Sequence, residues 1–83
     1  MAKKIIIAKE LGEIKCFFDE NLYMIDREDL EKFCLGAHVM GEIHSWDLTK
    51  LEYGEIRLNF NPTRQKAEGV AERLGQYIEN CKP

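Results

Sequence analysis

Residues 61–81 have the sequence NPTRQKAEGVAERLGQYIENC, in which apolar side chains recur at steps of three and four. This spacing gives an α-helix one apolar face. The residues of that face are Ala67, Val70, Ala71, Leu74, Tyr77, Ile78 and Cys81. Asn61 followed by Pro62 is typical of a helix start, because asparagine caps the first turn and proline needs no amide hydrogen there. We therefore predict an amphipathic helix over residues 62–81, covering a sheet.

Two glycines, Gly69 and Gly75, lie inside this predicted helix. Each costs about 1 kcal/mol in a helix interior relative to alanine. We expect them to leave gaps that a neighbouring strand or a second subunit fills.

Strand patterns precede the helix. Residues 55–61 alternate apolar and polar side chains, so Ile56, Leu58 and Phe60 should face a core. The β-branched run at residues 5–7 and the segment Glu13–Phe18 predict two further strands with a turn between them at Leu11-Gly12. The polar residues after Phe18 favour another turn, which predicts a third strand over residues 22–25.

A first helix is predicted in the middle of the chain. Asp26 is a good N-cap, and acidic residues follow it in the first turn. The apolar positions of this helix have helical spacing: Leu30, Phe33, Cys34 and Ala37. We expect the helix to end between Gly36 and Gly41. Residues 42–53 alternate only in part, which predicts a strand with a loose end.

The predicted element order, β-β-β-α-β-β-α, is typical of the α+β class, with an antiparallel sheet of four to five strands and two helices. A chain of 83 residues has room for one core, so we expect a single domain over residues 1–83. A core of this size is marginal and the edges of the sheet are open, and both features favour a homodimer.

The spacing of the cysteines and the lengths of the apolar runs indicate a cellular compartment. The three cysteines lie far apart and are odd in number, which favours reduced thiols over a disulfide scaffold. The apolar run at residues 5–8 is too short for a signal-peptide core, and no apolar run approaches the length of a membrane span. We therefore expect a cytoplasmic protein that does not bind membranes.

Residues 19–31, which we call the acidic segment, show the strongest charge asymmetry in the chain, because Arg27 is their only cation. Their carboxylates are Asp19, Glu20, Asp26, Glu28, Asp29 and Glu31. The segment lacks the ligand alternation and the glycine of a calcium loop. It is either a solvated face or a surface for a basic protein partner, such as a nucleic-acid-binding protein. We predict a small non-enzymatic interaction module, a regulator or inhibitor that occupies a partner surface, with these six residues as its partner-binding site.

A second hypothesis is a nucleic-acid-binding module, in which dispersed basic residues and aromatic side chains gather on one face. The basic residues are Lys3, Lys4, Lys9, Lys15, Arg57, Arg64, Lys66 and Arg73. The aromatic residues are Tyr23, Trp46 and Tyr53. The net charge of −3 opposes attraction to phosphate, but direct binding of nucleic acid is not excluded.

A third hypothesis is a thiol or zinc protein that uses Cys34, His38 and His44. Cys34 and His38 are four residues apart on the predicted first helix, but a tetrahedral site would need Cys16 or Cys81 to complete it. All three cysteines fall on predicted core faces, where apolar surroundings raise a thiol pKa. We accordingly predict no catalytic residue, no metal site and no cofactor.

Overall fold

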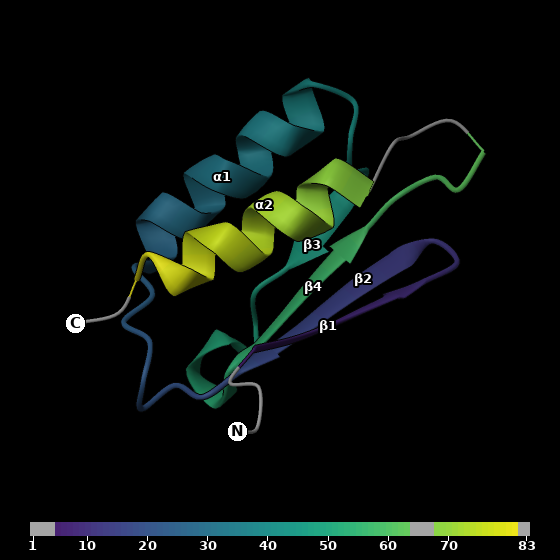
Figure 1. Cartoon of the computed structure of the whole chain (residues 1–83). Helices are drawn as coiled ribbons and strands as arrows, with labels where there is room; N and C mark the ends of the chain where they lie inside the picture. The colour runs from purple at the N-terminus through teal and green to yellow at the C-terminus, as the bar shows by residue number, and fades with distance from the viewer. Residues whose placement is uncertain (1–4, 64–67, 82–83) are drawn as a thin grey trace.

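The computed structural model describes residues 5–63 and 68–81. Its elements are β1 (Ile5–Glu10), β2 (Glu13–Phe18), α1 (Arg27–Val39), β3 (Ser45–Asp47), the 3-10 helix η1 (Leu51–Tyr53), β4 (Glu55–Asn59) and α2 (Glu68–Glu79). The four strands form one antiparallel sheet in the order β1-β2-β4-β3, and both helices cover the same face of it (Figure 1). The predicted α+β class is confirmed.

The β1-β2 hairpin follows the sequence pattern closely. Glu10 pairs with Glu13, which leaves Leu11 and Gly12 as the turn. Gly12 has φ +83°, a left-handed conformation that glycine adopts without steric cost. The predicted turn is therefore in place.

The core lies between the sheet and the helices. On β2, Ile14 and Cys16 pair with Leu58 and Ile56 of β4, and all four side chains are fully buried. Alternation places their strand neighbours on the opposite, open face of the sheet. The prediction that Ile56 and Leu58 face the core is confirmed, and Phe60 is half-buried against it.

Both helices bury the predicted apolar stripes. The core residues of α1 are Leu30, Cys34 and Ala37, and those of α2 are Val70, Leu74 and Ile78. The helices also contact each other, since the rings of Phe33 and Tyr77 lie 5.5 Å apart between centroids. Asp26 is the N-cap of α1 as predicted, and the helix ends at Val39, between the two glycines.

The predicted third strand over residues 22–25 is wrong. The backbone amides of Leu22 and Tyr23 donate to the carbonyl of Asp19, and the amide of Met24 donates to the carbonyl of Cys81 after α2. These bonds use the amides that a strand would need, so only two strands precede α1. The apolar pattern there comes instead from Tyr23 and Ile25, which pack against the core as an irregular loop.

The predicted start of the last helix is also wrong, because Pro62 and Thr63 form a turn. Asn61 does cap, but it caps this turn: its side-chain oxygen accepts hydrogen bonds from the amide and the hydroxyl of Thr63, at 3.0 and 2.8 Å. Residues 64–67 lie outside the described residues, and α2 spans Glu68–Glu79.

The segment between α1 and β4 is only partly a strand. Ser45–Asp47 pairs with β4 on the side opposite β2, and η1 follows. Within the described residues, neither helix is long and apolar enough to cross a membrane.

Candidate functional site

One end of the sheet carries a hollow with an apolar floor. The hollow forms where the loop after β2 meets η1, and its volume is about 590 Å³. Its floor consists of Phe18, Tyr23, Ile25 and Leu51, and Met24 lies at its edge with 68% of its surface exposed. Phe18 and Tyr23 stack edge to face in this floor, with 6.4 Å between ring centroids.

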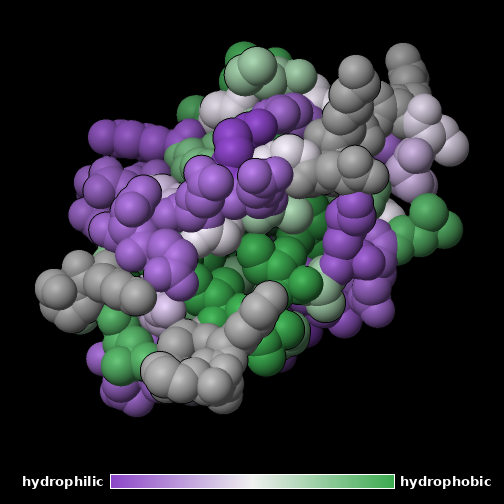
Figure 2. All heavy atoms as spheres, viewed as in Figure 1, coloured by the Kyte–Doolittle hydropathy of each residue, from purple (hydrophilic) through white to green (hydrophobic). Residues whose placement is uncertain are grey.

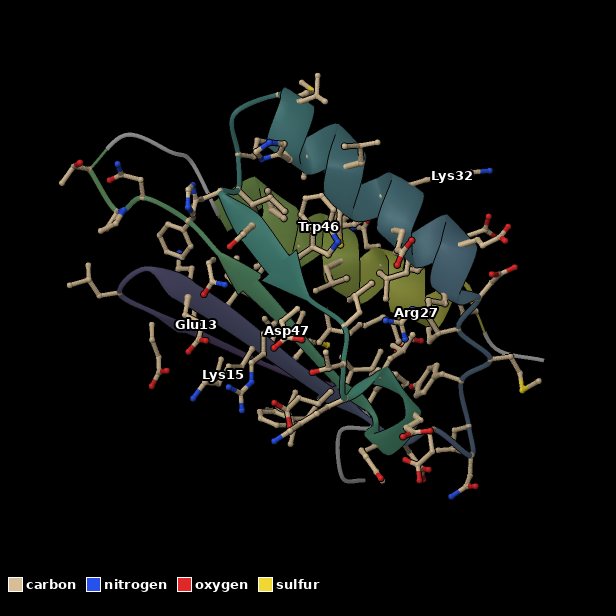
Figure 3. The ribbon with its side chains drawn as sticks, turned by 180° about the vertical axis from the view of Figure 1, so that it is seen from behind. Glu13, Lys15, Arg27, Lys32, Trp46 and Asp47 are labelled. Carbon is tan, nitrogen blue, oxygen red and sulfur yellow. The ribbon has the colours of Figure 1, made fainter. Side chains whose placement is uncertain are left out.

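Charged residues surround this floor. The rim carries three carboxylates, Glu20, Asp26 and Glu52, and one guanidinium, Arg27. Arg27 lies at the start of α1 (Figure 3), where its Nε is 3.5 Å from an oxygen of Glu31. Within the part of the chain that the structure describes, none of the three rim carboxylates forms an ion pair. We call this feature the acidic hollow.

The six predicted partner-binding residues do not form one surface. Glu20 and Asp26 lie on the acidic hollow. Glu28 and Glu31 line a smaller groove with Trp46. Asp19 supports its own turn, where its side chain accepts a hydrogen bond from the amide of Asn21 at 2.9 Å. Asp29 lies near Tyr77 and Cys81, where burial raises the pKa of both and the charge of Asp29 adds to the effect.

Leu51 and Glu52 belong to the acidic hollow but were not predicted. They lie some twenty residues beyond the acidic segment, and only the fold brings η1 beside the loop after β2. Gly54 is the sequence signal that could have indicated them. Glycine permits the left-handed backbone of a tight turn, and Gly54 adopts it directly after η1.

Three described basic residues of the nucleic-acid hypothesis, Lys15, Arg57 and Arg73, form ion pairs. On the open face of the sheet (Figure 3), Lys15 lies 3.6 Å from Glu10 and 3.7 Å from Glu13, and Arg57 pairs with Glu55. Lys3, Lys4, Arg64 and Lys66 lie outside the described residues. The described part therefore presents no uncompensated basic face built on Lys15 or Arg57.

Arg73 is also paired, but on the helix side of the molecule. Its guanidinium donates to both carboxylate oxygens of Glu42, and this hydrogen bonding lowers the pKa of Glu42. The pair links α2 to the segment after α1.

The aromatic residues of that hypothesis do not share a platform. Tyr23 is 2% exposed and its hydroxyl donates to Glu79 at 3.3 Å. Trp46 packs against the core beside His38, with 5.8 Å between ring centroids, while Tyr53 is exposed at the end of η1.

The thiols are placed for packing. Cys16 and Cys34 are fully buried, and burial raises the pKa of each to about 12. His44 is exposed, and the ring of His38 lies 3.2 Å from the carbonyl oxygen of Ile43. Among the described residues, no three His, Cys, Asp or Glu side chains gather closely enough to hold a metal ion.

Comparisons with known proteins add no relative: no family model matches the chain, and neither the curated proteins nor the solved structures contain a significant match.

Proposed function

We propose that this protein is a small non-enzymatic interaction module, a regulator or inhibitor that works by occupying the surface of a protein partner. The observation that carries this proposal is the acidic hollow, an apolar floor whose three rim carboxylates form no ion pair with described residues. Elsewhere on the surface, carboxylates such as Glu13 and Glu42 are paired with cations. The hollow therefore combines apolar area with an excess of carboxylates over cations.

The chemistry of the hollow defines its occupant. A segment with one apolar side chain flanked by lysine or arginine would cover the floor and neutralise the rim. Met24 supports such binding, since an exposed methionine adapts to the shape of what it contacts. We accordingly identify the partner segment as basic with an apolar anchor, which refines the predicted basic protein partner.

A peptide titration tests this proposal. The probe is a five-residue peptide with a central leucine flanked by lysines, and a second peptide replaces the lysines with glutamates. In NMR titrations of the labelled protein, the lysine peptide should shift the amides of Tyr23, Ile25 and Leu51. The glutamate peptide should shift them little, because the rim repels it.

Matched variants separate the rim from general acidity. The triple variant Glu20→Gln, Asp26→Asn and Glu52→Gln should weaken binding of the lysine peptide about tenfold, given the usual worth of three exposed charge pairs. Asp26→Asn is chosen because asparagine still caps α1. The control removes as much charge from carboxylates outside the hollow, through Glu10→Gln, Glu13→Gln and Glu42→Gln, and should bind as wild type.

Two results would overturn the proposal. One is equal binding of the lysine peptide by the rim variant and by wild type, with both folded according to their urea midpoints. The other is equal binding of the two peptides, which would mean that the carboxylates select nothing.

A further inference from the structure

A second apolar hollow, the edge groove, runs between β1 and α2. Its floor is formed by Ile5 and Ile7 of β1 with Ala71 and Gly75 of α2, and its volume is about 690 Å³. Figure 2 shows this apolar surface facing the viewer below the hydrophilic side of α2. A Cβ atom at Gly75 would lie 3.2 Å from Cδ1 of Ile7, so glycine there lets the helix approach the edge strand closely.

Hydrogen bonding across the sheet gives the direction of the backbone groups in β2. The amide of Phe18 donates to the carbonyl of Gly54 at 2.9 Å, and the amide of Phe60 donates to the carbonyl of Gly12 at 3.0 Å. Hydrogen-bonded pairs alternate along an antiparallel ladder. The even-numbered residues of β2 therefore bond to β4, and its odd-numbered residues bond to β1.

The pairing register then gives the direction of the backbone groups in β1. The odd-numbered residues of β2 are paired with Ile6, Ala8 and Glu10, so these three use their backbone groups inside the sheet. The N–H and C=O groups of Ile5 and Ile7 consequently point outward, and their side chains face the helices. No strand in the described part of the chain pairs with this edge.

The edge lacks the usual protection against pairing. Its register with β2 is unbroken, so it has no bulge, and it contains no proline. Its charged residues come only at the hairpin end, after four apolar positions. Natural edge strands that must stay single commonly carry such features in the middle of the strand.

We propose that a second copy of this chain occupies the edge groove, through antiparallel pairing of the two β1 strands about a two-fold axis centred on Ile7. Side chains directly opposite each other in such a pair share a face, so odd-numbered residues oppose odd-numbered ones and the axis passes through a residue, not between two. A centre at Ile7 overlaps residues 5–9 and so keeps all three isoleucines of β1 in the pairing. It places Ile7 opposite its own copy, Ile6 opposite Ala8 and Ile5 opposite Lys9, with no like charges opposed.

The open face of the sheet supports this occupant over a foreign strand. Near β1 that face is apolar, with Ile6 56% and Phe17 39% exposed, whereas the neighbouring strands carry paired charges there. In the proposed register each Ile6 packs beside Ala8 of the second copy. Two exposed apolar patches thus adjoin each other across the axis, which is the self-complementarity that a two-fold interface requires.

Sedimentation equilibrium of the full chain tests the association. The wild type should show an average mass that rises with concentration from 9.7 kDa towards twice that value. Ile6→Glu, on the open face and outside the core, should raise the dissociation constant at least about tenfold. Leu11→Glu is the matched control, because it adds the same charge at a turn position that is 89% exposed, and it should associate as wild type.

Cross-linking tests the register. In a Cys81→Ser background, Ile7→Cys should form an intermolecular disulfide under mild oxidation, because directly opposite residues have Cα atoms about 5.5 Å apart. Ala8→Cys should not, since its own copy lies two positions away. A wild type that stays at 9.7 kDa at millimolar concentration, or an Ile6→Glu variant that associates like wild type, would overturn the proposal.

Discussion

Single residues carry some of the strongest constraints in this fold, and Gly54 is the clearest case. It has φ +78°, and a Cβ atom there would lie 2.0 Å from the backbone carbonyl oxygen of Phe18. Because that oxygen is part of the backbone, no side-chain rotation relieves the contact. The glycine also brings the carboxylate of Glu20 close to the end of η1, at the rim of the acidic hollow.

We predict that Gly54→Ala lowers the free energy of unfolding by about 2–4 kcal/mol, since the left-handed backbone alone costs 1–2 kcal/mol and the clash adds to it. Urea denaturation followed by circular dichroism measures this. Gly36→Ala is the control: Gly36 lies within α1 with no atom within 4 Å of the added Cβ, so alanine should stabilise by about 0.5–1 kcal/mol. A Gly54→Ala variant as stable as wild type would refute the steric argument.

At the scale of elements, the two helices differ in how well their starts could be predicted. Asp26 caps α1 through a hydrogen bond from the amide of Glu28 at 2.9 Å, as the sequence indicates. Asn61 offers the same local chemistry, yet its side chain closes the turn at Thr63. Capping residues also form isolated turns, so the sequence signal alone does not distinguish the two outcomes.

We predict that Asp26→Ala lowers the free energy of unfolding by about 1 kcal/mol, because it removes the cap of α1. Asp26→Asn should change it by only a few tenths, since asparagine caps nearly as well. Thermal or urea unfolding of both variants gives the comparison. If Asn proved as costly as Ala, the charge of Asp26, and not its hydrogen bond, would be the stabilising feature.

The wrong prediction of a strand over residues 22–25 also concerns a single element. Tyr23 and Ile25 have the spacing of a strand, but the segment hydrogen-bonds to Asp19 and Cys81. The bond to Cys81 joins residues nearly sixty positions apart. Local periodicity detects which side chains are apolar, and it does not detect which distant backbone group satisfies an amide.

At the scale of the whole molecule, the core joins side chains from both layers. Cys16 comes from the sheet and Cys34 from α1, and both are fully buried. Neither becomes accessible through fraying of a single loop. Their reactivity should therefore report the opening of the whole fold.

We predict that both thiols react with an alkylating reagent at similar rates, at least about a thousandfold more slowly than in concentrated urea.

The free energy of unfolding should also fall as the pH rises above about 9, because of the same two thiols. The folded state keeps these protons until about pH 12, whereas the unfolded chain loses them near 9.0, so deprotonation favours unfolding. Mass spectrometry of alkylated protein and urea midpoints from pH 7 to 10.5 test this. Much faster labelling of one thiol would indicate local opening instead.

The sequence by itself determined what depends on near neighbours. The alternation over Glu13–Phe18 and Glu55–Asn59 and the helical spacing in α1 and α2 set which side chains are buried, because burial of one face is a local pattern. The cap at Asp26 and the turn at Gly12 were equally local.

Only the tertiary structure decided what depends on contacts between distant segments. It inserted β4 between β2 and β3, brought Glu52 to Glu20 and Asp26, and paired Arg73 with Glu42. It also divided the acidic segment among separate surfaces. The physical reason is that such contacts follow from how the packed layers satisfy their backbone bonds and exclude water, which no short window of sequence contains.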